Sequence, residues 1–309
     1  EAEARAGGGV PALEEIHRRG MANGVEGLRQ LDPSGIREIE PNAAGVAGLH
    51  VPGTASVDFQ KIAEAMALRL ERLGGTVRLK SEVLSIANGS TGIGISTSTG
   101  DLSAGYLVNC AGLQCDRVAR MAGADPEVQI VPFRGEYYEI KDDRAGLVNG
   151  MIYPVPDPRF PFLGVHFTKT VSGDIEAGPN AVLALSREGY RWGSIDGTDL
   201  WETLRNPGLW VVARRYWKTG IGEMVRSASK RAFVSALQRL LPAIQTDDVV
   251  RAGAGVRAQA MDRKGNLLDD FSIEESPRAL HVLNAPSPAA TASLAIGEHL
   301  AGLVLERSA

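Results

Sequence analysis

Tyr106-Leu107-Val108-Asn109-Cys110-Ala111-Gly112 is the stretch that decides the fold of this chain. Its first five residues are mostly apolar and predict a strand of a buried sheet. Two small residues follow, and a helix that includes Asp116–Met121 comes next. Ligands of open α/β sheets bind where a strand leads into a turn at the start of a helix. The stretch therefore predicts an α/β lobe with a ligand site at Ala111-Gly112.

The segments before this stretch suit the same lobe. Helices are expected at residues 11–23 and from Asp32-Pro33 through Ile39, where an N-cap precedes a proline. Asp58 caps a third, amphipathic helix that Gly74-Gly75 ends. Three strands are expected after it, at Thr76–Leu79, Val83–Ala87 and Gly92–Ser98. An Asn-Gly turn joins the last two.

The second half of the sequence predicts a different lobe. Residues 129–140 and 163–178 have strand patterns bounded by proline and glycine, which indicate an antiparallel sheet. Residues 198–243 are helical in pattern. Strands return from Val249 to Leu283, and a terminal helix covers 289–305. We expect an α/β lobe made of residues 1–125 and 249–309. The second, α+β lobe spans 126–248 and includes a helical insertion.

Composition excludes several classes of protein. The net charge of −4 and pI near 5.8 give no basic field for nucleic acid. No run of 18 apolar residues predicts a membrane span. Cys110 and Cys115, both expected to be buried, are too few for a disulfide framework and lack the second ligand pair of a zinc site. We expect free thiols, no metal and a cytoplasmic location. The G-x-S-x-G motif of serine hydrolases is absent.

A cluster of basic residues lies within the predicted helical insertion. Its members are Arg214, Arg215, Lys218, Arg226, Lys230 and Arg231. A solvated helical face is the favoured interpretation, and a contact with an anionic membrane is the alternative.

Gly7-Gly8-Gly9 is the first candidate for a dinucleotide site. Such sites need a buried strand, then glycines, then a helix whose N–H groups face the phosphates. The preceding residues, Glu-Ala-Glu-Ala-Arg-Ala, do not predict a buried strand. We therefore expect a loop at these glycines, and no other match to the fingerprint has the right context.

A second candidate follows the last predicted strand. Pro286, Ser287, Pro288, Ala289, Ala290 and Thr291 place small residues at the start of the terminal helix. Small side chains let a flat ligand approach the backbone, and the free N–H groups and the helix dipole favour negative charge. Close packing of helix on sheet explains the same pattern equally well.

Polar residues in the predicted strands form a third candidate site. Arg257 lies between glycines, where its planar guanidinium would bind a carboxylate in two places; an internal salt bridge is the alternative. Arg134, Tyr137 and His166 lie on strands that would let them share one pocket, and Asn180 follows. A lone histidine is more often structural than catalytic.

Several blocks, in order along the chain, resemble the L-2-hydroxyglutarate oxidase/dehydrogenase family, within the wider FAD-dependent oxidoreductases that include D-amino-acid oxidase. These blocks are Pro132–Tyr137, Tyr153–Pro158, Phe162–His166, Gly178–Ala184, Arg187–Tyr190, Gly255–Gln259 and Asn284–Thr291.

The resemblance implies FAD as cofactor and a fold with a Rossmann-like FAD-binding lobe and an antiparallel substrate lobe. It places Val83 at the adenine and Ala111 and Gly112 at the pyrophosphate. Pro286, Ser287, Pro288, Ala289, Ala290 and Thr291 would lie under the flavin. It assigns Arg257 to the substrate carboxylate and suggests Tyr137, Asn180, Arg134 and the catalytic candidate His166 as pocket residues.

The implied reaction is oxidation of L-2-hydroxyglutarate to 2-oxoglutarate, with quinone or oxygen as electron acceptor and peripheral contact with the inner membrane. The family's N-terminal strand, G-x-G-x-x-G and first helix have no counterpart here, so we expect the FAD-binding lobe to lack its first βαβ unit. Two alternatives follow: a catalytically incompetent fragment, or an oxidase for another 2-hydroxy or amino acid.

Overall fold

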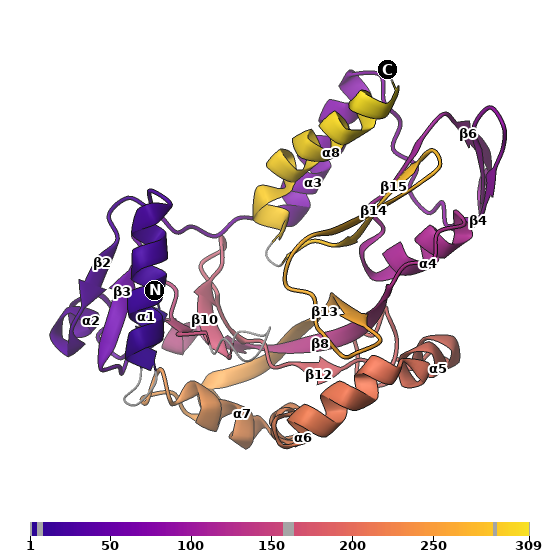
Figure 1. The fold of residues 1–309 in the computed structure, drawn as a ribbon. Coiled ribbons are helices and arrows are strands. Elements are labelled where there is room, and N and C mark those ends of the chain that lie inside the picture. Colours follow the sequence, from indigo (N-terminus) through magenta and orange to yellow (C-terminus); the bar gives the residue numbers. More distant parts are fainter. Residues whose placement is uncertain (1, 5–8, 157–163, 287–288, 309) are drawn as a thin grey trace.

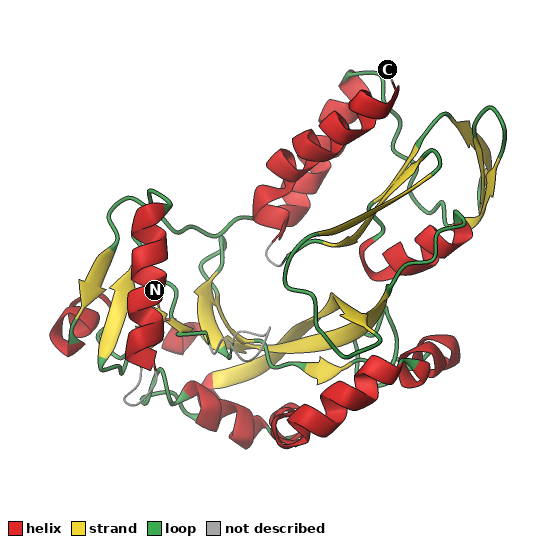
Figure 2. Ribbon diagram, viewed as in Figure 1, coloured by secondary structure: helices red, strands yellow, loops and turns green. Residues whose placement is uncertain are grey.

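The computed structural model describes residues 2–4, 9–156, 164–286 and 289–308. Two long strands, β8 (Val128–Ile140) and β13 (Val249–Asp262), cross the middle of the molecule, with other elements on either side (Figure 1). Helices α5 to α7 (residues 197–237) lie along one side of these strands, and α3 (Phe59–Arg72) and α8 (Ser293–Ser308) lie on the opposite side (Figure 2). The long strands thus carry residues of the predicted substrate pocket, and the predicted cofactor turns follow strands of a separate, smaller sheet.

The central sheet is antiparallel, as the sequence predicted. Its strand order is β10-β11-β8-β12, and β13 pairs with β8 along almost its whole length. The strands are β8 (Val128–Ile140), β10 (His166–Lys169), β11 (Ile175–Gly178), β12 (Val182–Leu183) and β13 (Val249–Asp262). Gly135 permits a close approach in this sheet, because a Cβ there would lie 2.6 Å from Cβ of Pro179.

The helical insertion covers one face of this sheet, which confirms the expectation for residues 198–243. It comprises α5 (Gly197–Arg205), α6 (Pro207–Ala228) and α7 (Lys230–Leu237). Side chains cap the three N-termini: Asp196, Asn206 and Ser229 accept from backbone N–H groups one turn on. Phe233 and Leu237 of α7 are fully buried in a core with Tyr138. Burial of such side chains is the main force that holds the insertion on the sheet.

A smaller sheet contains the stretch Tyr106–Gly112. Its strands are β14 (Ser272–Ser276), β15 (Ala279–Asn284) and β7 (Leu107–Asn109), in the order β14-β15-β7. After β7 come a 3-10 turn, η1 (Gly112–Gln114), and α4 (Cys115–Met121), so the predicted strand, turn and helix are confirmed. Cys115 is buried as expected, but Cys110 is exposed. Asn109 takes the inward position, and the next residue points outward.

The hairpin predicted before this stretch is present and larger than expected. It comprises β4 (Val83–Asn88), β5 (Ile93–Thr97) and an additional strand, β6 (Gly100–Ala104). The strand expected at Thr76–Leu79 is wrong: these residues form coil and a turn. Leu79 is 81% exposed, and no described strand pairs with this segment. A strand needs a neighbour to satisfy its backbone groups, which local sequence does not reveal.

A fourth sheet joins distant parts of the chain in the order β2-β3-β1-β9. Its strands are β1 (Ala2–Ala4), β2 (Arg29–Leu31), β3 (Ala47–His50) and β9 (Tyr153–Pro154). The sequence predicted no buried strand before Gly7-Gly8-Gly9, yet β1 forms there; residues 5–8 lie outside the described residues, and Gly9 begins α1. β1 is antiparallel to β3 and parallel to β9, unlike the parallel strands around a dinucleotide fingerprint.

The remaining helices begin and end close to the predicted positions. They are α1 (Gly9–Ala22), α2 (Pro33–Ile39), α3 (Phe59–Arg72) and α8 (Ser293–Ser308), which follows η4 (Ala289–Ala292). Two short 3-10 turns, η2 (Asp142–Leu147) and η3 (Thr246–Asp248), flank the central sheet. Asp32 and Asp58 cap α2 and α3 as expected. No residue of α3 is buried, although its apolar side chains share one face. Within the described residues, no helix is long and apolar enough to cross a membrane.

Candidate active site

The two segments proposed for a cofactor meet at one edge of the small sheet. β7 and β15 are parallel neighbours, with Leu107 opposite Ala279 and Asn109 opposite His281. Ala111 and Gly112 follow the end of β7, and Pro286 follows the end of β15. Because parallel strands end at the same edge, both turns lie there, which is the ligand position of open α/β sheets.

The turn at Ala111 and Gly112 is exposed and accessible to a ligand. Gly112 has a φ of +52°, which disfavours other residues, and no atom lies within 4 Å of a Cβ built there. Asn109 holds the turn: its Oδ1 accepts from N of Ala111 at 3.1 Å, and its Nδ2 donates to the carbonyl of Cys115 at 2.8 Å. A small, fixed, exposed turn of this kind fits a pyrophosphate.

The other predicted cofactor residues lie in η4, which follows β15, or in the hairpin of β4 and β5. In η4, Ala289 is half-buried, and Ala290 and Thr291 are exposed. Ser287 and Pro288 lie outside the described residues. Val83 begins β4, and the hairpin is fixed to α4 where Asn88 Nδ2 donates to the carbonyl of Ala122 at 2.7 Å. The small residues of both turns fit a flat ligand such as a flavin.

A buried histidine supports this edge, which the sequence did not indicate. His281 is fully buried, its Nδ1 lies 3.2 Å from Nδ2 of Asn109, and its Nε2 lies 3.0 Å from Oγ of Ser276. Burial lowers the pKa of His281, so the neutral ring is favoured. Asn109 and His281 are 172 residues apart, and no local pattern relates them.

Tyr137 and His166 lie on the central sheet on either side of Gly178. His166 in β10 is opposite Gly178 in β11, and β11 is paired with β8. A Cβ on Gly178 would lie 2.7 Å from the carbonyl oxygen of Glu136 and 3.3 Å from Cδ1 of Tyr137, so the chain is closely packed at this glycine. Because cross-strand neighbours project to the same face, His166 and Tyr137 flank a position without a side chain. This pair is the best-defined part of the predicted pocket.

The surroundings of His166 define its tautomer. Its ring stacks on Tyr153, with centroids 4.3 Å apart, and its Nδ1 lies 3.0 Å from the carbonyl oxygen of Gly164. A carbonyl only accepts, so Nδ1 carries the proton and Nε2 of the neutral ring is an acceptor. Burial lowers the pKa of His166, and the hydrogen bond to Gly164 raises it by less. The neutral ring is thus favoured, as a general base requires.

Arg257 lies on β13 opposite Phe133 of β8. Phe133 packs against a buried cluster that includes Leu209 of α6, and the alternation of Phe133, Gly135 and Tyr137 along β8 places Arg257 on the same side of the strand as Tyr137. Between them, Gly255 is opposite Gly135, and no atom lies within 4 Å of a Cβ built on Gly255. Burial lowers the pKa of Arg257, and the guanidinium stays charged near neutral pH. The sequence flagged this arginine but not the open space at Gly255.

Arg134 and Asn180 belong to a different environment, and Arg134 does not join the pocket of Tyr137 and His166. Arg134 alternates with Tyr137 and so projects to the opposite face, where it pairs with Glu136 at 3.3 Å and stacks on Trp192. Asn180 accepts from N of Glu136 at 2.8 Å and donates to Glu136 Oε2 at 3.1 Å. Ser227 of α6 also donates to Glu136. These groups mainly bind each other.

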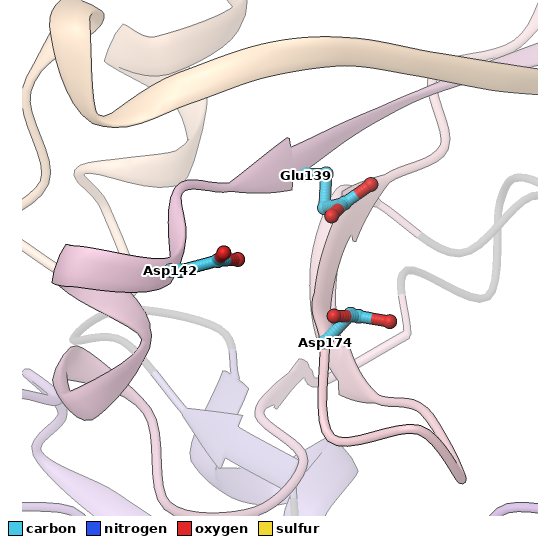
Figure 3. Close-up of side chains that lie close together, drawn as sticks. All are labelled: Glu139, Asp142 and Asp174. Atoms are coloured by element: carbon cyan, nitrogen blue, oxygen red, sulfur yellow. The ribbon is translucent and has the colours of Figure 1, made fainter.

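An acidic cluster borders the Tyr137 face at its far end. The carboxylate oxygens of Glu139, Asp142 and Asp174 lie within 4.8 Å of one another (Figure 3). Burial raises the pKa of Glu176, and the charges of Glu139 and Asp174 raise it further. Exposed acidic groups are common without an ion, so we assign no metal here. The cluster would repel a substrate carboxylate, whereas Arg257 would attract one.

Comparisons with known proteins identify the family to which the chain belongs. The family model described as FAD dependent oxidoreductase matches residues 4–303. The L-2-hydroxyglutarate dehydrogenase of Indibacter alkaliphilus is 52% identical over 299 residues, which cover 96% of this chain and 75% of that protein. The mitochondrial L-2-hydroxyglutarate dehydrogenase of Homo sapiens is 41% identical, with 96% and 68% covered.

A solved structure has the same fold. It is the L-alpha-glycerophosphate oxidase of Mycoplasma pneumoniae with FAD bound, at a TM-score of 0.73 and 20% identity, and the match covers 95% of this chain and 69% of that one. At this identity the likeness concerns the fold alone.

Proposed function

The chain belongs to the FAD-dependent oxidoreductase family, and from this premise we propose that it oxidises L-2-hydroxyglutarate to 2-oxoglutarate. The observation that carries the proposal is that curated relatives from bacteria to mammals, 40–52% identical over nearly the whole chain, are L-2-hydroxyglutarate dehydrogenases. They favour this substrate over another 2-hydroxy or amino acid.

Several residues of the chain would hold FAD. Ala111 and Gly112 would face the pyrophosphate, Pro286 and Ala289 to Thr291 the flavin edge, and Val83 the adenine. When bound, FAD supplies the acceptor for the hydride that leaves C2 of the hydroxy acid. The exposed small-residue turns at the shared edge of β7 and β15 support this assignment, because they admit a flat, anionic group to the backbone.

Arg257 is proposed to bind a substrate carboxylate. A guanidinium that is partly buried and still charged forms stronger hydrogen bonds to a carboxylate than an exposed one. Gly255 leaves room for the substrate beside it. Since the acidic cluster at Glu139 and Asp174 would repel the substrate, we place its carboxylates toward the Arg257 end of the face.

His166 is proposed as the base that takes the proton of the substrate hydroxyl. Its neutral ring presents Nε2 as an acceptor, while Gly164 and Tyr153 hold the ring in place. Tyr137 would donate a hydrogen bond to the substrate, because burial first, and then the charges of Glu176 and Tyr153, raise its pKa and keep it protonated. Arg134 and Asn180 are proposed to support the pocket indirectly, by fixing Glu136 and its strand.

The decisive experiment combines a flavin titration with a substrate screen. The purified chain should bind FAD and then oxidise L-2-hydroxyglutarate with a higher kcat/KM than the D enantiomer, L-lactate, glycerol 3-phosphate or glycine. Failure to bind added FAD would contradict the proposal and favour the catalytically incompetent alternative. A higher kcat/KM for another acid would contradict the substrate assignment alone. Oxygen uptake and quinone reduction, measured in parallel, identify the electron acceptor.

We also propose a peripheral membrane contact through α5, α6 and the preceding loop. All four tryptophans of the chain lie here and are about half exposed or more: Trp192, Trp201, Trp210 and Trp217. Ile221 and Met224 are exposed on the same helix α6, among the basic residues Arg214, Arg215 and Lys218. Exposed tryptophan with lysine and arginine is typical of helices that lie in a membrane interface. Co-sedimentation with anionic vesicles, lost in Trp217→Ser, is the test.

A further inference from the structure

Arg187 is almost completely buried, with 1% of its surface exposed, and lies four residues after β12. Its guanidinium binds Asp116 at two places: Nη1 donates to Oδ1, and Nη2 donates to Oδ2 at 3.0 Å. Nη1 also donates to the carbonyl oxygen of Leu113 at 2.6 Å. A bidentate pair of this kind fixes geometry as well as charge.

The partners of Arg187 follow directly on the proposed pyrophosphate turn. Leu113 belongs to η1, which begins at Gly112, and Asp116 belongs to the first turn of α4. Asp116 Oδ2 also accepts from N of Ile130 in β8, at 3.2 Å. Asp116 itself therefore links the start of α4 to the long strand of the central sheet, and Arg187 links Asp116 and the turn to the segment that follows β12.

The same pair connects the turn to the substrate side. The chain runs to Arg187 from Leu183 of β12, which is opposite Phe133 in β8, and Phe133 is opposite Arg257. The segment from Leu183 to Arg187 thus spans the interval between the strand beside the proposed carboxylate site and the proposed flavin turn.

A balanced set of charges surrounds this connection. Asp199 of α5 accepts from N of Arg187 at 2.6 Å and from Nη2 of Arg117 at 2.6 Å, and Arg117 also binds Glu202. Burial raises the pKa of Asp116, but hydrogen bonds and charge from Arg187 lower it by more, so Asp116 stays ionised. Three arginines thus pair with three carboxylates: Arg117, Arg120 and Arg187 with Asp116, Asp199 and Glu202.

We propose that Arg187 is a positioning residue of the cofactor site, which holds the Ala111-Gly112 turn at a fixed place relative to the strands that carry Arg257 and Tyr137. The effect of Arg187 on FAD binding rests on the proposed function, which assigns the Ala111-Gly112 turn to FAD. The connection itself is a property of this chain and is measurable without the cofactor.

Arg187→Lys is the variant that tests the role. Lysine keeps the positive charge but has only one donor nitrogen. It therefore cannot bind both oxygens of Asp116 and the carbonyl of Leu113 at once. Arg120→Gln is the matched control. Arg120 binds the same carboxylate, at 3.1 Å, from within α4 and is 42% exposed, so its loss leaves the connection to β8 and β12 intact.

Two readouts are measured on both variants and the parent chain. The first is amide hydrogen exchange in the apoprotein: Arg187→Lys should raise exchange at residues 111–117 by tenfold or more, and Arg120→Gln by less than twofold. The second is the Kd for FAD together with the rate of flavin reduction by substrate. Arg187→Lys should raise the Kd at least tenfold and slow reduction, with little change in the substrate KM.

The outcomes separate the proposals. Unchanged exchange at the turn in Arg187→Lys overturns the connection. Raised exchange with parental FAD affinity and reduction rate overturns the positioning role and leaves Arg187 structural. If the parent chain binds no FAD, the proposed function fails, and the exchange experiment still decides whether Arg187 holds the turn.

Discussion

The two faces of β8 carry similar polar residues and differ in what those residues bind. On one face, Arg134 and Glu136 bind each other, and Asn180 and Ser227 bind Glu136. On the other face, Tyr137 and His166 flank Gly178, and Arg257 lies beside the open space at Gly255. Residues that are one position apart in sequence thus have opposite environments.

The difference between the two faces indicates which of them binds the substrate. A buried polar group whose hydrogen bonds are made within the protein contributes to stability, because losing its partner leaves a desolvation cost. The face that has an acceptor nitrogen on His166 and open space at Gly255 is suited to bind a ligand. Substitutions on the two faces should therefore separate activity from stability.

His166→Ala should have the largest effect on catalysis. Loss of a general base lowers kcat/KM by a factor of about 1,000, within the usual range for such groups. Since burial lowers the pKa of His166 from 6.5, the parent enzyme should lose activity as the pH falls below about 6.5, through this lowered pKa. Stability should fall in the same direction, because protonation favours the unfolded chain. A parental pH profile without this acidic limb would contradict the assignment; His17→Ala on α1 is the control.

Arg257→Met should follow in magnitude. Hydrogen bonds to a charged group contribute about 1.5–3 kcal/mol each, so kcat/KM for L-2-hydroxyglutarate should fall about 100-fold, mainly through KM. Arg251→Met, on the same strand but exposed, is the matched control and should retain the parental KM. An equal loss in both variants would indicate a general effect of positive charge and not a carboxylate site.

Glu136→Gln should affect stability more than activity. It weakens the contacts with Arg134, Asn180 and Ser227, and the free energy of unfolding should fall by about 2 kcal/mol. The substrate KM should stay within about twofold of the parental value, since these groups bind one another and project away from Tyr137. Urea denaturation and steady-state kinetics measure both. A large rise in KM at unchanged stability would show that the Glu136 face, and not the Tyr137 face, binds the substrate.

Tyr137→Phe should have the smallest effect. It removes one hydroxyl, and the loss of one neutral hydrogen bond costs about 1 kcal/mol, or roughly fivefold in kcat/KM. The ring that lies against Gly178 is retained, so the unfolding midpoint should not change. Kinetics and thermal unfolding of the same preparation check this. A fall as large as that of His166→Ala would make Tyr137 the better candidate for the proton acceptor.

Much of the fold could be predicted because its signals are local. Caps at Asp32 and Asp58, the Asn-Gly hairpin and the alternation of β8 all depend on neighbours within a few residues. The strand expected at Thr76–Leu79 was wrong and β1 was missed, because a strand exists only where another strand pairs with it. The pairing of β1 with β9 joins residues on both sides of the boundary placed at residue 125, and the division into two lobes stays a prediction.

The sequence by itself determined the family, the need for FAD and the residue types of the site, because ordered motifs such as Gly255–Gln259 and Asn284–Thr291 are contiguous. Only the tertiary structure decided which of those residues share a surface. It separated Arg134 from Tyr137, brought Gly178 between Tyr137 and His166, and joined Arg187 to Asp116 across 71 residues. The physical reason is that register between strands and the pairing of buried charges are set by long-range contacts, to which local sequence patterns do not extend.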